Sequence, residues 1–130
     1  MARVTGIGGV FFKATDASAL GAWYRKHLGI DVQDWGGAVF SWAAEGPSAP
    51  AGYTVWSPFA ADTKHFAPSD KPFMVNFRVD DLDALLASLR ASGCNVLDRR
   101  EDTEQGAFGY VVDPEGTLLE LWQPSPDRPV

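Results

Sequence analysis

The chain has 130 residues, and 17 acidic against 11 basic residues give it a net charge of −6 and a pI of about 4.7. This length fits a single domain, 1–130, with a core of its own. The negative charge argues against nucleic acid and anionic membrane as partners, and the sequence contains no apolar run that could cross a bilayer. The single cysteine, Cys94, rules out an internal disulfide and favours a cytoplasmic location.

The first half of the chain predicts a strand, a helix and three more strands. Residues 4–14 are rich in β-forming residues and end at a polar turn. Asp16 then stands where a helix N-cap belongs and Gly29 where that helix would end, with apolar residues at helical spacing between them. The three short β-like runs that follow are separated by turn sequences and cover 30–35, 38–43 and 53–56.

A connector at about 60–72 separates this half from the next. It is rich in Pro, Ser, Asp and Ala and contains Phe66. An aromatic residue in such a segment indicates that the connector packs on the rest of the molecule.

The second half predicts the same order of elements. A strand at 73–79 precedes a helix that is capped by Asp80 or Asp81 and ends at Gly93. The Asp113–Gly116 tetrad has the residue preferences of a type I turn, which predicts a hairpin between the last two strands. The three strands after the helix are expected near 96–99, 106–112 and 118–122.

The two halves are also similar in sequence. When Asp16 is laid on Asp81, Val10 meets Val75 and Phe12 meets Phe77, and further along Trp56-Ser57-Pro58 meets Trp122-Gln123-Pro124. Each half is therefore one βαβββ module, the first at about 4–59 and the second at about 73–124. A module of this size cannot close a core alone, so the two must share one, and a ligand is expected at their junction.

This duplicated unit, with W-Y-x-x-x-L-G at the end of the first helix and a D-P-x-G turn before a final E-L-W, resembles the vicinal oxygen chelate superfamily. Members of that superfamily include glyoxalase I, bleomycin-resistance proteins, epimerases and extradiol dioxygenases. The resemblance implies an α+β fold in which two tandem βαβββ modules form a cupped mixed sheet. It also implies a homodimer, with each cup built from one chain or from two.

In metal-using members, the resemblance implies a divalent ion held by residues of the first and last strand of each module. The corresponding positions here are Gly9, Thr54, Met74 and Glu120. Glycine has no side chain, and a thioether is a poor ligand for hard divalent ions. We therefore expect no metal site and no cofactor, unless the register of these positions is off by two residues.

Strand alternation predicts which other side chains face the cup. The alternate positions, such as Val75, Phe77 and Leu121, are apolar and suit packing beneath the helices. The side chains expected to bind a ligand combine aromatic rings with a few polar groups, and they are Phe11, Lys13, Trp42, Thr54, Trp56, Met74, Asn76, Arg78 and Trp122.

Glu120 is the candidate catalytic residue. As a general base it would have a pKa raised by the apolar walls. The alternative is an inert carboxylate paired with Arg78 or Lys13 across the cup. His65, in the connector, is expected in a solvated loop, although its imidazole could fold over the mouth of the cup.

These observations support a protein that binds a small, partly aromatic or anionic molecule by stacking in the cup. The alternative is an enzyme of the lyase, isomerase, epimerase or dioxygenase kind, which either uses a metal or uses Glu120 as a base. A third hypothesis is an assembly domain whose cup is filled by its own side chains. The sequence does not decide between them.

Overall fold

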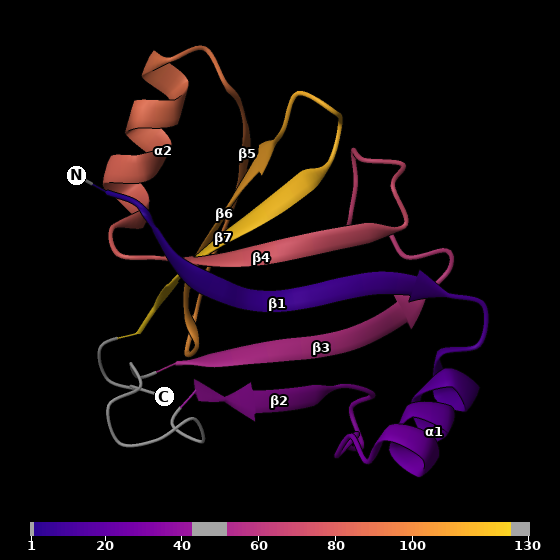
Figure 1. Ribbon diagram of the computed structural model, residues 1–130. Helices are drawn as coiled ribbons and strands as arrows, with labels where there is room; N and C mark the ends of the chain where they lie inside the picture. The colour runs from indigo at the N-terminus through magenta and orange to yellow at the C-terminus, as the bar shows by residue number, and fades with distance from the viewer. Residues whose placement is uncertain (1, 43–51, 126–130) are drawn as a thin grey trace.

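The computed structural model describes residues 2–42 and 52–125, which form one seven-stranded sheet and two helices (Figure 1). The first module contains β1 (Val4–Ala14), α1 (Ala17–Leu28), β2 (Ala38–Ser41) and β3 (Tyr53–Ala60). The second contains β4 (Phe73–Val79), α2 (Leu82–Ala91), β5 (Asn95–Thr103), β6 (Gly106–Val112) and β7 (Leu118–Pro124). The predicted α+β class with a mixed sheet is confirmed.

The strand order β2-β3-β1-β4-β7-β6-β5 has an internal pseudo-twofold axis. The central strands β1 and β4 are antiparallel and pair Val10 with Val75, two residues that are equivalent in the sequence repeat. On either side, β3 runs parallel to β1 and β7 runs parallel to β4. The duplicated sequence therefore folds into two related halves that share one sheet.

Both helices begin at the predicted caps. Asp16 accepts a hydrogen bond from the Ala19 amide at 3.0 Å, and Asp81 accepts one from the Ala84 amide at 3.1 Å. Of the two cap candidates before α2, Asp81 is therefore correct. Gly29 follows α1 in the left-handed conformation, with φ of 68°, that glycine adopts at no steric cost.

The strand expected at 30–35 is absent, so the described part of the first module is βαββ. The run 30–35 forms an extended segment and a turn, in which the Gln33 amide donates to the Gly37 carbonyl at 2.8 Å. Arg25 on α1 also donates to the Val32 carbonyl at 2.7 Å, which ties this segment to the helix instead of to the sheet. The expected strand 38–43 ends at Ser41, with residue 43 outside the described part of the chain, and the strand expected at 53–56 continues to Ala60.

The two helices pack on the same face of the sheet. Val79, Leu82, Leu86, Val111 and Leu121 form a buried cluster beneath α2, and Trp56 lies beneath Tyr24 of α1 with ring centroids 4.8 Å apart. The apolar strand positions expected beneath the helices are confirmed for Leu121, which belongs to this cluster, and for Phe77, which packs against it.

The connector covers part of the opposite face. Phe66 is fully buried there and packs with Met74, Tyr110 and Leu118 in a second cluster. The expectation that the connector packs on the molecule is therefore confirmed, and it leaves the rest of this face for a cavity.

None of the described helices is long and apolar enough to span a membrane.

Candidate functional site

A cavity of about 450 Å³ opens on the sheet face opposite the helices. Its walls are mainly aromatic and include Phe11, Tyr53, Phe108 and Trp122. Trp122 contacts two of the other rings, with its centroid 5.0 Å from Tyr53 and 6.4 Å from Phe108. Asn76 and Glu120 supply polar groups to the same cavity.

Strand register brings these residues together. Asn76 on β4 pairs with Glu120 on β7, which in turn pairs with Tyr110 on β6. Trp122 pairs with Phe108 in the same way. Because directly paired residues project from the same face of a sheet, this polar row and this aromatic row both face the cavity.

Thr54 and Trp56 do not face the cavity, and the expected orientation of both is wrong. Trp56 pairs with Val10 and Ala38 and stacks on Tyr24 of α1. Thr54 accepts a hydrogen bond from Trp42 Nε1 at 2.8 Å and donates to the Ile7 carbonyl at 2.7 Å. Tyr53 and Val55, their neighbours along β3, line the cavity instead.

The error came from the sequence match of Trp56 with Trp122. In the sequence repeat, Phe11 corresponds to Asn76. In the structure Phe11 pairs with Ser57 and Asn76 pairs with Glu120. Ser57 is therefore the structural equivalent of Glu120. Phe59, three positions beyond Trp56, is then the equivalent of Trp122. An odd shift along a strand moves every side chain to the other face.

The two cations expected in the cup lie away from the cavity lining. Arg78 stacks on Trp42, with the guanidinium carbon 5.4 Å from the ring centroid. Lys13 extends toward Phe66 of the connector, with Nζ 6.0 Å from that ring centroid. Of the expected ligand-binding residues, the structure therefore brings Phe11, Asn76 and Trp122 together with Glu120, while Met74 is buried under the connector.

Glu120 is 6% exposed and is held by several donors. Asn76 Nδ2 donates to Oε1 at 2.7 Å, and the Tyr110 hydroxyl donates to Oε2 at 2.6 Å. Burial acts to raise the pKa of Glu120, but the donors of His65, Tyr110 and Asn76 outweigh it and hold this pKa below its usual value. The expected raised pKa is therefore wrong, and the partners are not the expected Arg78 or Lys13.

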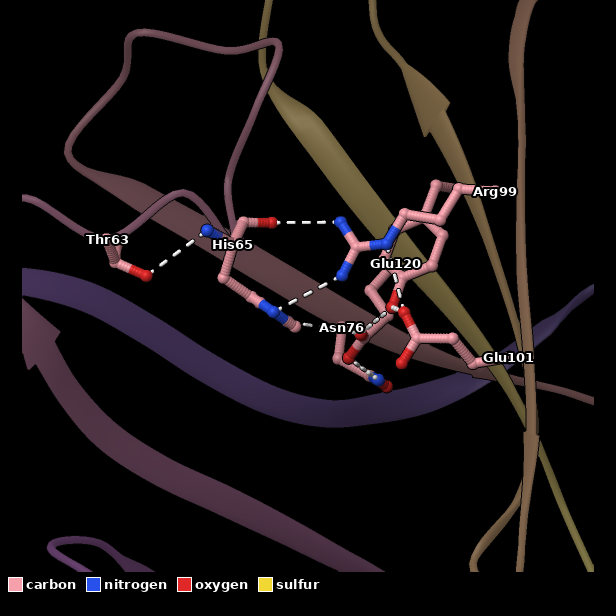
Figure 2. A network of polar contacts seen from close by, with 7 residues as sticks. Thr63, His65, Asn76, Arg99, Glu101 and Glu120 are labelled. Atoms are coloured by element: carbon pink, nitrogen blue, oxygen red, sulfur yellow. Dashed lines mark hydrogen bonds and ion pairs between the residues drawn. The ribbon is translucent and has the colours of Figure 1, made fainter.

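His65 reaches Glu120 from the connector, as Figure 2 shows, with Nε2 3.6 Å from Glu120 Oε2. Arg99 donates to the His65 carbonyl at 3.1 Å and lies 3.2 Å from His65 Nδ1. A guanidinium can only donate, so Nδ1 must accept and the ring proton is on Nε2, directed at Glu120. His65 thus directs Nε2 at the carboxylate and is a positioning residue, which the sequence identified only as an imidazole able to fold over the cup.

Tyr110 lies between two carboxylates. Its hydroxyl oxygen is 2.6 Å from Glu120 and 2.9 Å from Glu101, although it has only one proton to donate. Burial, and next the charge of Glu120, raise the pKa of Tyr110 far above its usual value, so it remains a phenol. Arg99 balances the charge of Glu101 through a contact of 2.9 Å and also covers the Tyr110 ring.

The side-chain amide of Asn76 has a fixed orientation, in which its oxygen does not take part in the bond to Glu120. Its Nδ2 must face Glu120, because a carboxylate accepts and does not donate. Oδ1 consequently points toward Gly8 and has no hydrogen-bond partner among the described residues. A Cβ at Gly8 would lie within 2.3 Å of this oxygen, so only glycine fits beside it.

Comparison with known proteins identifies the family. The family model described as a glyoxalase-like domain matches residues 9–122. The chain belongs to the glyoxalase-like domain family, within the vicinal oxygen chelate superfamily. A comparison with curated proteins finds no match.

Solved structures share the fold of this glyoxalase-like domain. A Streptomyces coelicolor methylmalonyl-CoA epimerase variant superposes with a TM-score of 0.67 at 19% identity, covering 95% of this chain and 99% of that one. The Mycobacterium tuberculosis methylmalonyl-CoA epimerase gives a TM-score of 0.59 at 22% identity, covering 95% of this chain and 91% of that one. An Mn(II)-bound glyoxalase from Novosphingobium aromaticivorans gives a TM-score of 0.62 at 24% identity, covering 95% of this chain and 40% of that one.

The metal site that the superfamily implies does not fit the residues present in this glyoxalase-like domain. With the corrected register, the four ligand positions are occupied by Gly9, Ser57, Met74 and Glu120. Met74 is fully buried in the apolar cluster under the connector, and both Glu120 oxygens already accept hydrogen bonds from the protein. Within residues 2–42 and 52–125, no three His, Cys, Asp or Glu side chains are grouped to hold a metal ion.

Proposed function

We propose that this glyoxalase-like domain binds a small, flat and largely apolar molecule in the cavity, without the metal site of its superfamily. The observation that carries the proposal is the aromatic wall of Tyr53, Trp122 and Phe108 beside the Glu120–Asn76 pair. A cavity of about 450 Å³ with apolar walls and few polar groups has the usual make-up of a small-molecule site.

Removal of the central ring of this wall tests the proposal. Acridine, a neutral three-ring molecule at mildly alkaline pH, serves as the probe in a fluorescence titration. The Trp122→Ala variant should bind acridine about tenfold or more weakly than the wild type, because stacking and burial on Trp122 are lost.

Two further variants complete this test. Val55→Trp fills the same cavity and should also abolish binding, whereas Trp56→Ala removes a tryptophan from the other face and should leave affinity unchanged. A wild-type protein that binds none of the flat probes, or that loses affinity equally in the Trp56 and Trp122 variants, would contradict the proposal.

An enzyme of the epimerase, lyase or dioxygenase kind is the second candidate, with Glu120 as the base. It is favoured by the likeness to methylmalonyl-CoA epimerases and by a carboxylate at the cavity. A base with a lowered pKa has little affinity for a proton at neutral pH, which favours the binding protein. Exchange of the α-proton of methylmalonyl-CoA in D₂O, present in the wild type and absent in Glu120→Gln, would instead establish the enzyme.

A homodimer and a cytoplasmic location remain predictions for this chain. The homodimer is supported by Val10 and Phe73, which are 38% and 41% exposed on the helix-bearing face of the sheet.

A further inference from the structure

The described residues that line the cavity include an acidic side chain but no lysine or arginine. This acidic side chain is that of Glu120, the one carboxylate among them. Arg99 pairs with Glu101 at 2.9 Å, and His65, which lies 3.6 Å from Glu120, belongs to the connector and not to the cavity lining. Among the described lining residues, no lysine or arginine therefore offsets the charge that Glu120 presents to the cavity.

The polar groups at this point mostly accept hydrogen bonds. A carboxylate oxygen can accept two hydrogen bonds, and among the described residues only Asn76 donates to Glu120 Oε1. Asn76 directs its own buried oxygen at Gly8, so it offers no acceptor to a ligand in the cavity. A ligand that donates to Glu120 Oε1 would use the acceptor position that remains and would be bound more tightly.

The aromatic walls also favour a positively charged ligand. The faces of aromatic rings carry partial negative charge and attract cations, most strongly in tryptophan. Trp122 and Phe108 lie nearly parallel, at 16°, beside the carboxylate. An anionic group in the same place would meet Glu120 without a compensating cation.

We infer that the ligand of this cavity carries a protonated nitrogen on its flat body, which donates to Glu120 while the rings of Trp122 and Phe108 cover the rest. This inference rests on the proposed function, because it names the chemical class bound at that same site. It replaces the anionic ligand considered from the sequence, since Arg78 and Lys13 are not among the residues that line the cavity.

Three acridines of nearly equal shape test the inference. At mildly alkaline pH, 9-aminoacridine is a cation, acridine is neutral and acridine-9-carboxylate is an anion. The wild-type protein should bind 9-aminoacridine about tenfold more tightly than acridine, and the carboxylate most weakly of the three.

Glu120→Gln should reduce the preference for the cation over acridine to about twofold or less, because it removes the negative charge that favours the cation. Glu115→Gln removes the same charge from an exposed turn outside the cavity and should leave the preference intact. The ranking in the wild type decides the inference even if Glu120→Gln fails to fold. Equal affinity for all three probes, or tightest binding of the anion, would overturn the inference and leave the proposed function standing, whereas no binding of any probe would overturn both.

Discussion

Glu120 remains ionised although it is almost fully buried, because three neighbouring side chains direct donors at it. Asn76 and Tyr110 hold it directly, and His65 is oriented toward it by Arg99. Sequence reasoning identified Glu120 through the superfamily resemblance and Asn76 through strand alternation. It missed Tyr110, Arg99 and Glu101, because no local sequence pattern indicates the register in which β5, β6 and β7 pair with one another.

The pH dependence of stability provides a test at the level of this residue. The pKa of Glu120 is lower in the folded state than its usual value of 4.5, so its ionised form stabilises the fold above that value. This contribution should be lost as the pH falls through the folded-state pKa. The difference in unfolding free energy between the wild type and Glu120→Gln should therefore shrink in acid, as urea titrations across pH would measure.

The exposed Glu115→Gln variant is the matched control for this measurement, and its difference from the wild type should show no comparable trend. A wild-type advantage over Glu120→Gln that stays constant or grows in acid would contradict the assignment of the donors.

At the level of elements, the connector between β3 and β4 shapes the site. Phe66 fills one end of the concave face, and the adjacent His65 reaches the carboxylate. The Lys13 amide donates to the Pro72 carbonyl at 2.7 Å, which fixes the end of the connector against β1. The connector therefore covers part of this face of the sheet and directs His65 at the acidic group of the cavity.

Truncation of the buried ring should show how much this packing contributes. Phe66→Ala should lower the free energy of unfolding by about 3 kcal/mol, because it leaves a cavity in a fully buried cluster. Phe73→Ala removes the same ring from a site that is 41% exposed and should cost about 1 kcal/mol. Equal losses in denaturant titrations of the two variants would show that the connector does not pack as described.

At the level of the whole molecule, the twofold arrangement of modules gives the sheet two faces with different roles. One face carries both helices, and the other carries the connector and the cavity. Trp56 and Trp122 match in the sequence repeat but lie on different faces. The same residue type is therefore structural in one module and part of the site in the other.

A comparison of the two tryptophan variants tests this division. Trp56→Ala should lower the free energy of unfolding by about 2 kcal/mol, since the half-buried ring packs on Phe12 and Tyr24, and should leave acridine affinity unchanged. Thermal unfolding and probe titration on the same sample would measure both effects. Loss of acridine binding by folded Trp56→Ala would place the site on the helix-bearing face instead.

The sequence by itself determined the helices, most strands and the repeat, because caps such as Asp16 and Asp81, glycine stops and β-rich runs act over a few residues. It also predicted, through the resemblance, that Gly9 and Met74 occupy two ligand positions without offering a good ligand for a hard divalent ion. Only the tertiary structure decided which face Thr54 and Trp56 occupy and where His65 and Arg99 meet Glu120. These features depend on strand register and on the path of the connector, which are set by contacts between residues far apart in the chain.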